Sequence, residues 1–225
     1  MQKVILYYTN NQLHSGIMTA CQQALLKAAG DIPIVCVGQQ PMEFGAVNID
    51  MGPLKKERRS ITFQMYHGLL AAWQKFQPDV VFTAEHDVMY PEGYFDFTPS
   101  KPEIYYYCTN KYYMTDCCFV QSDHPTLSTL SCDFKHLLSH VTVRLYRTDK
   151  LHKKKGGWAA IEPGRYTDNY MGELEFVPRD RPHIDIRHDG NLSQVFFNTY
   201  PREQMHQQTP YWGDHTKLKE QLKWT

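Results

Sequence analysis

The chain has 225 residues, of which 42% are hydrophobic and 21% are charged, values typical of a soluble globular protein rather than a disordered one. The 24 Lys and Arg residues equal the 24 Asp and Glu residues in number, so net charge gives no general attraction to nucleic acid or to an anionic membrane. A chain of this length forms one sizeable core, and we expect a single domain over residues 1–225.

The sequence contains no stretch that is long and apolar enough for a membrane span. Its first apolar run, residues 4–8, is also too short for the core of a signal peptide. Six cysteines without a secretory signal are typical of reduced thiols inside a cell. We therefore expect a cytoplasmic protein that does not contact a membrane.

Short apolar runs and amphipathic segments alternate in the first part of the chain. They predict, in order, strand 4–8, helix 15–29, strand 33–38, helix 60–76 and strand 80–84. Gly30 follows the first helix as a typical end signal, and Ser60 is a candidate cap for the second. The alternation predicts an α/β fold with a mostly parallel central sheet flanked by helices.

The second part of the chain is less regular. It predicts a strand at residues 104–107, a helix within 127–147, a strand at 184–186 and a short charged helix at 217–223. In a parallel sheet, functional sites lie beyond the carboxyl ends of the strands. Polar residues that directly follow a predicted strand are therefore the first candidates for a site.

Glu85-His86-Asp87 directly follows the buried strand at 80–84. Hard divalent cations prefer carboxylate oxygens together with substrate phosphates, so this acidic pair suits Mg²⁺ or Mn²⁺ bridging a diphosphate. The alternative is a solvated polar turn at the end of a strand.

A second polar group, Arg187-His188-Asp189, follows the strand at 184–186. A neutral imidazole at His188 suits a metal ion, and the Arg187 guanidinium suits phosphate oxygens. His188 is alternatively a structural histidine, since the chain has 11 histidines.

With these motifs, the whole chain resembles the small GT-A glycosyltransferases of bacteria and phages. The resemblance rests on Thr9-Asn10, on Glu85-His86-Asp87 with the following Tyr90 and Pro91, on residues 95–99 and 105–107, on Glu162-Pro163-Gly164, and on residues 184–192. It implies a GT-A-like, Rossmann-like domain with a nucleotide-binding half at about 1–100 and an acceptor-side half at about 101–225. It also implies a nucleotide-sugar donor, with UDP as the expected nucleotide, held through Mn²⁺ or Mg²⁺.

The resemblance further implies roles for individual residues. Asp87 is the expected principal metal ligand, His188 completes the metal site, and Glu85 lies at the metal or nearer the ribose. Because the first acidic position is Glu rather than Asp, direct coordination by Glu85 stays open. The remaining donor-binding candidates are Thr9, Asn10, Arg58, Arg59, His86 and Arg187.

An inverting transfer needs a carboxylate that takes the proton of the acceptor hydroxyl. Glu162, in a loop with Pro163 and Gly164, is the first candidate for this catalytic base, and Asp189 is the second. A carboxylate that only stabilises a turn is the alternative for Glu162. A retaining enzyme needs no such base, so the stereochemistry stays open.

Two further features leave alternatives open. Cys108, Cys117, Cys118, His124, Cys132 and His136 could hold zinc, but they contain no Cys-x-x-Cys pair, and buried thiols are the other interpretation. The run Lys153-Lys154-Lys155-Gly156-Gly157-Trp158 could contact DNA, or it is a solvated loop.

The sequence therefore predicts a metal-dependent glycosyltransferase that moves a hexosyl or pentosyl group to an acceptor hydroxyl. The phage resemblance allows a hydroxymethylated DNA base as acceptor, in which case the protein would act in the host cytoplasm. A nucleotidyltransferase, or a binding module for carbohydrate or nucleic acid that kept the fold, remain the alternatives.

Overall fold

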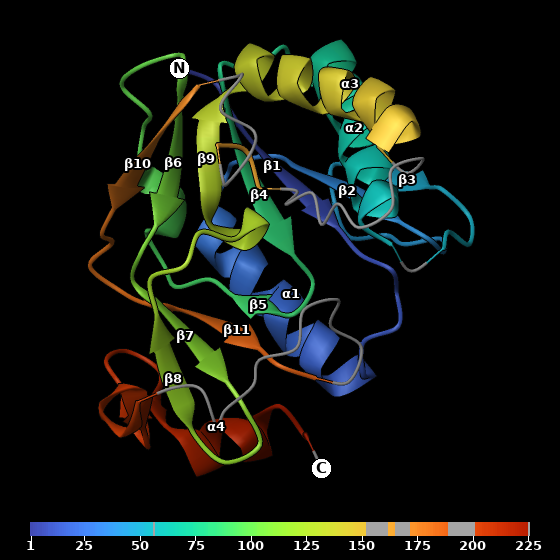
Figure 1. Cartoon of the computed structure of the whole chain (residues 1–225). Helices are drawn as coiled ribbons and strands as arrows, with labels where there is room; N and C mark the ends of the chain where they lie inside the picture. The colour runs from blue at the N-terminus through green and yellow to red at the C-terminus, as the bar shows by residue number, and fades with distance from the viewer. Residues whose placement is uncertain (56, 152–161, 165–171, 189–200, 225) are drawn as a thin grey trace.

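The computed structural model describes residues 1–55, 57–151, 162–164, 172–188 and 201–224 (Figure 1). Its main feature is a seven-stranded sheet in the order β10-β6-β9-β4-β1-β2-β3. Among these strands β9 alone runs antiparallel to its neighbours. The mostly parallel α/β fold predicted from the sequence is confirmed.

The main sheet is buried on both faces, which explains the nearly continuous apolar runs in its central strands. Its strands are β1 (Lys3–Tyr8), β2 (Ile34–Gly38), β3 (Val47–Asp50), β4 (Val80–Glu85), β6 (Ile104–Cys108), β9 (Leu130–Asp133) and β10 (Glu173–Val177).

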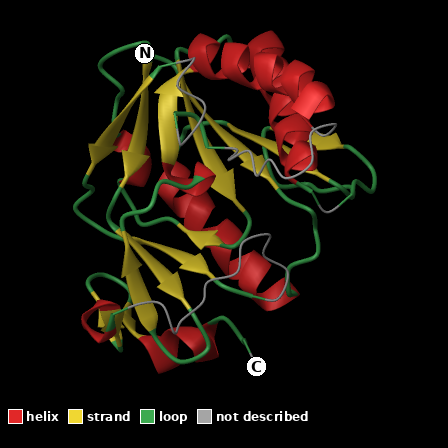
Figure 2. Cartoon of the chain, in the orientation of Figure 1, coloured by secondary structure: helices red, strands yellow, loops and turns green. Residues whose placement is uncertain are grey.

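Helices cover the two faces of this sheet (Figure 2). Helices α2 (Arg58–Phe76) and α3 (Phe134–Leu151) pack on one face, and α1 (Ser15–Ala29) packs on the other. Because side chains alternate along a strand, Leu6 packs with Leu69 of α2 while its neighbour Ile5 packs with Leu25 of α1. A Cβ atom at Gly68 would lie 2.3 Å from Leu6 Cδ1, so glycine allows α2 to approach β1 closely.

A second, five-stranded sheet lies below the first in Figure 1, in the order β12-β8-β7-β11-β5. Its strands are β5 (Val88–Met89), β7 (Lys111–Met114), β8 (Phe119–Ser122), β11 (His183–Ile186) and β12 (Met205–His206). Apolar residues of β7 and β11 form a core with α1 and with the C-terminal helix α4 (His215–Gln221). The smaller elements are η1 (Tyr94–Asp96), η2 (Leu127–Thr129), η4 (Arg202–Gln204), β13 (Gln208–Thr209) and β14 (Gly213–Asp214).

One predicted helix start, with its predicted cap, is wrong. Helix α2 begins at Arg58 with Glu57 as its N-cap, and the Ser60 hydroxyl instead donates to the Lys55 carbonyl oxygen at 2.6 Å. The helix predicted within 127–147 begins only at Phe134, because the preceding residues form η2 and β9. None of the helices in the described residues combines the length and the apolar character that a membrane span requires.

Candidate metal centre

The connection between the two sheets carries the first half of the candidate site. Strand β4 ends at Glu85 and β5 begins at Val88, so His86 and Asp87 link the main sheet to the second sheet. Strand β11 pairs antiparallel with β5, and the Ile186 N–H donates to the Asp87 carbonyl oxygen at 2.8 Å. The residues that follow β11 therefore lie beside this link.

His86, Asp87 and His188 come together as a group. Each offers one ligand atom, and the three atoms lie within 4.8 Å of one another. His188 Nε2 lies 3.4 Å from Asp87 Oδ2, and the two histidine rings are 6.0 Å apart between centroids. Within the described parts of the chain, no other set of three His, Cys, Asp or Glu side chains has this spacing.

The protonation states in this group suit a metal ion. Burial raises the pKa of Asp87, but the neighbouring His86, His188 and Arg187 outweigh this effect and hold that pKa below its usual range. Burial lowers the pKa of His86, so its ring stays neutral near pH 7. An ionised carboxylate and a neutral imidazole are the forms that bind metals, so the residues present fit a divalent cation.

Glu85 lies beside this group and has a different environment. The Tyr8 hydroxyl donates to Glu85 Oε1 at 2.8 Å, and the Glu85 N–H donates to the Tyr90 hydroxyl at 3.2 Å. Burial, with the charges of Asp87 and Asp185, raises the pKa of Glu85 to about 8. A protonated carboxyl is a poor metal ligand, so this placement favours a supporting position for Glu85 over direct coordination.

Arg187 is held rigidly next to the group. Its Nη2 donates to Asp185 Oδ2 at 3.0 Å, and its guanidinium carbon lies 4.0 Å from the centroid of the Tyr113 ring. Lys111 Nζ in turn donates to the Tyr113 hydroxyl at 3.1 Å. The ion pair is almost fully buried, with side-chain exposures of 10% for Arg187 and 4% for Asp185. This guanidinium is therefore oriented in advance for an anion.

The carboxyl end of β1 carries the residues predicted to meet the nucleoside. Thr9 is buried, and its hydroxyl accepts a hydrogen bond from the Asn11 N–H at 2.9 Å. The Asn10 side-chain oxygen accepts from the Gln12 N–H at 3.0 Å. Asn11 has a positive φ of 58°, and its side-chain oxygen accepts from the Gln39 N–H at 2.7 Å. Asn11 thus joins the loops after β1 and β2.

Gln64 of α2 holds the ends of β1 and β2 through hydrogen bonds. Its buried side-chain Nε2 donates to the Thr9 carbonyl oxygen at 2.8 Å and to the Val37 carbonyl oxygen at 3.1 Å. The sequence pattern placed Asn11 at the end of the first strand, but it did not predict a role for Gln64. A polar residue on the apolar face of α2 was the available signal for Gln64.

The predicted catalytic base lies in a short described segment, residues 162–164. The Tyr107 hydroxyl donates to the Pro163 carbonyl oxygen at 2.7 Å. Because β9 is antiparallel to both β4 and β6, those two strands run in the same direction and end at the same edge of the sheet. Glu162 is therefore attached, through Tyr107 near the end of β6, at the edge where Glu85 ends β4.

The other predicted residues are less informative. Arg59 lies exposed in the first turn of α2. Three of the predicted features lie outside the described residues: the Arg58 side chain, Asp189 and the basic run at residues 153–158. The cysteines and histidines considered for zinc are all described, and they form no group of three with metal-binding spacing.

No protein-family model matches the sequence, and no curated protein matches it. Two glycosyltransferases are among the solved structures that are similar to the chain. One is a glycosyltransferase involved in the glycosylation of the major capsid of PBCV-1, with a TM-score of 0.48 and 11% identity over 79% of this chain and 82% of that chain. The other is the apo form of the glycosyltransferase GlyE from Streptococcus pneumoniae TIGR4, with a TM-score of 0.43 and 14% identity over 71% of this chain and 41% of that chain.

Proposed function

We propose that the protein is a metal-dependent glycosyltransferase that uses a nucleotide-sugar donor. The observation that carries this proposal is the group of His86, Asp87 and His188, which lies beside the oriented guanidinium of Arg187. The group lies where β4 leaves the mostly parallel sheet, at the carboxyl end where such folds bind nucleotides.

In this proposal, Asp87 and the two imidazoles hold Mn²⁺ or Mg²⁺, and the imidazoles favour Mn²⁺ because Mg²⁺ prefers oxygen ligands. When bound, such an ion neutralises the charge that develops on a departing diphosphate. Arg187 donates to the diphosphate oxygens from its fixed position on Asp185 and Tyr113. The end of β1, with Thr9 and Asn10, contacts the nucleoside.

Glu162 is proposed as the base that takes the proton of the acceptor hydroxyl, if the transfer inverts the sugar configuration. Its support is the hydrogen bond that anchors Pro163 to Tyr107 at the edge of the main sheet. Asp189, next to His188 in the sequence, stays the second candidate. The resemblance to phage enzymes suggests a hydroxymethylated DNA base as one candidate acceptor.

A nucleotidyltransferase is the main competing enzyme class. Such enzymes usually have a glycine-rich phosphate loop with a basic residue after the first strand. Here that segment, residues 9–14, contains no glycine, Lys or Arg. The competing non-catalytic class, a binding module, needs no metal-dependent affinity for nucleotides.

A thermal-shift measurement tests the proposal. UDP and UDP-sugars should raise the melting temperature in the presence of Mn²⁺ and not in EDTA. Asp87→Ala should abolish that shift, because it removes the ionised ligand. Asp31→Ala is the matched control, since this exposed carboxylate precedes β2 and so lies at the opposite edge of the sheet.

An unchanged shift in Asp87→Ala would overturn the assignment of the metal centre. Absence of any nucleotide-dependent shift, across purine and pyrimidine diphosphates, would favour the binding-module class. A metal-dependent shift with nucleoside triphosphates alone would favour the nucleotidyltransferase.

A further inference from the structure

The tight turn between β7 and β8 holds two adjacent cysteines against each other. The Thr115 N–H and hydroxyl donate to the Cys118 carbonyl oxygen at 3.0 and 2.8 Å. The same hydroxyl oxygen accepts from the N–H groups of Cys117 at 3.3 Å and Cys118 at 3.1 Å. This compact turn leaves the two sulfur atoms 3.7 Å apart, which is direct contact.

The pair differs from the remaining cysteines in access to solvent. All six cysteines are free thiols, and Cys117 is the one that is exposed. Cys118 is 5% exposed, and burial raises the pKa of its thiol. An external reagent therefore reaches Cys117 first, with Cys118 already in contact behind it.

We propose that Cys117 and Cys118 form a redox-active vicinal dithiol whose reaction partner is a small-molecule disulfide of the glutathione type. The Cys117 thiolate attacks one sulfur of that disulfide, which forms a mixed disulfide and releases one thiolate. Cys118 then loses its proton and attacks the Cys117 sulfur, which releases the second thiolate. The protein loses two electrons and two protons, and the small disulfide is reduced to two thiols.

The oxidised ring is strained, so the reaction is readily reversed by thiols. Bond formation brings the two sulfur atoms from 3.7 Å to about 2.05 Å, and the turn has to rearrange around them. Strained disulfides have more oxidising potentials than structural ones and are the labile, regulatory kind.

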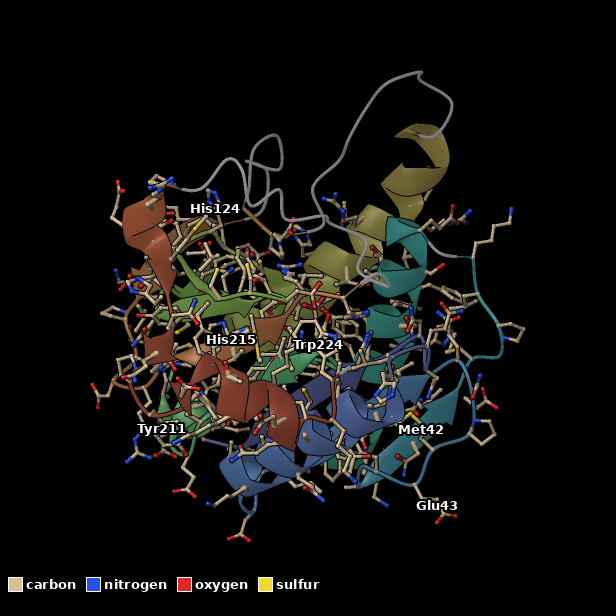
Figure 3. All side chains as sticks on the ribbon, turned by 90° about the horizontal axis from the view of Figure 1, so that it is seen from below. Met42, Glu43, His124, Tyr211, His215 and Trp224 are labelled. Carbon is tan, nitrogen blue, oxygen red and sulfur yellow. The ribbon has the colours of Figure 1, made fainter. Side chains whose placement is uncertain are left out.

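Contacts of this turn lead toward the candidate metal centre. The Arg187 N–H donates to the carbonyl oxygen of Met114, directly before the turn, at 2.8 Å. On the other side, Gln207 Nε2 donates to the Cys117 carbonyl oxygen at 3.1 Å, and His215 Nε2 hydrogen-bonds the Thr115 carbonyl oxygen at 2.8 Å. Figure 3 views the molecule from below, onto α4 and the labelled His215. Oxidation should therefore lower Mn²⁺ affinity, because rearrangement of the turn displaces the Met114 carbonyl oxygen that holds the backbone of Arg187 next to His188.

The test treats the full-length protein with oxidised glutathione and then alkylates the remaining thiols. Peptide mass spectrometry should find the peptide with both cysteines lighter by two hydrogen atoms and unalkylated. Cys118→Ser should instead accumulate glutathione on Cys117, because no second thiol displaces it. Cys36→Ser, which changes a buried cysteine of β2, should react like the wild type.

Two results would overturn the dithiol assignment. One is stable glutathione on Cys117 in the wild-type protein, and the other is alkylation of both Cys117 and Cys118 after treatment with oxidised glutathione. The coupling to Mn²⁺ rests on the proposed metal centre, whereas the thiol chemistry does not. Unchanged Mn²⁺ affinity of the oxidised protein would overturn the coupling alone. Absence of Mn²⁺ binding in the reduced protein would overturn the proposed function and leave the dithiol intact.

Discussion

At the residue scale, the two carboxyl groups of the Glu85-His86-Asp87 sequence have opposite electrostatic environments. Asp87 faces two imidazoles and a guanidinium, which favour its charged form. Glu85 is buried with Tyr8 and close to other carboxylates, which favours its neutral form. One residue of separation thus yields an ionised carboxylate and a neutral carboxyl group, because Glu85 ends β4 whereas Asp87 lies in the link to β5, beside His188.

This difference predicts a pH effect of Glu85→Gln. The folded-state pKa of Glu85 is raised from 4.5 to about 8, so the folded protein binds the extra proton between these values. The contribution of Glu85 to wild-type stability is therefore full below pH 4.5 and falls as the pH rises toward 8, by up to about 1.4 kcal/mol per pH unit. Glutamine lacks this loss, so the variant should gain stability relative to the wild type across that window.

Urea unfolding in EDTA at several pH values measures this effect. Glu173→Gln, at an exposed position in β10, is the control and should follow the wild-type curve. Parallel curves for Glu85→Gln and the wild type would show that Glu85 is ionised in the folded protein.

Arg187 gives a second prediction at the residue scale. Arg187→Lys keeps the positive charge but removes the planar fork that Asp185 and the Tyr113 ring orient. Affinity for UDP with Mn²⁺ should fall about tenfold, corresponding to about 1.4 kcal/mol. Isothermal titration calorimetry of UDP in the presence of Mn²⁺ measures this affinity. Arg181→Lys is the control, since Arg181 lies over the Tyr211 ring in an exposed position, and an equal effect of both changes would refute the role of Arg187.

At the scale of elements, the ends of β1 and β2 depend on one buried amide of α2. Gln64→Leu keeps the size of the side chain but removes the hydrogen bonds to the carbonyl oxygens of Thr9 and Val37. The protein should lose about 1–3 kcal/mol of stability, and nucleotide affinity should fall because the loops after both strands lose their support.

Denaturant unfolding and nucleotide titration check this prediction together. Gln74→Leu, at an exposed position of the same helix, should change neither quantity. If Gln64→Leu is destabilised but binds nucleotide with wild-type affinity, the hydrogen bonds of Gln64 support the fold and not the nucleotide site.

The elements that the sequence predicted well are those governed by local periodicity. The bounds of α1, residues 15–29, agree with the structure, and β1, β2 and β4 lie within one residue of the predicted strands. Strand β7 was missed because the buried but charged Lys111 shortens its apolar run to Tyr112, Tyr113 and Met114. Strand β9 was not predicted because its polar residues Ser131 and Asp133 interrupt the apolar run.

The candidate site divides in the same way. Asp87 and His188 were predicted because each lies within three residues of the end of a predicted apolar strand, and that signal is local. The supports of Arg187 were missed, because Asp185 and Tyr113 act through contacts between β11 and β7 that only the folded chain creates. Asp185, an acidic residue inside a buried strand, was the one signal available in the sequence.

At the scale of the whole molecule, an ion that binds only the folded protein stabilises it. At a Mn²⁺ concentration of 100 times the dissociation constant, unfolding should require about 2.7 kcal/mol more free energy. This gain should shrink at acidic pH, because protons compete with the ion for the imidazole of His86, whose pKa burial lowers. Differential scanning calorimetry with and without Mn²⁺ at pH 5 and pH 7.5 measures both effects, and an equal gain at both values would argue against histidine ligands.

Asp87 contacts His188, which lies about a hundred positions later in the chain. While the protein is being synthesised, β11 and the His188 that follows it emerge long after β4. The proposed metal centre can therefore be completed only late in the folding of a new chain. In that proposal, a bound ion distinguishes chains that have finished folding from incomplete or misassembled ones.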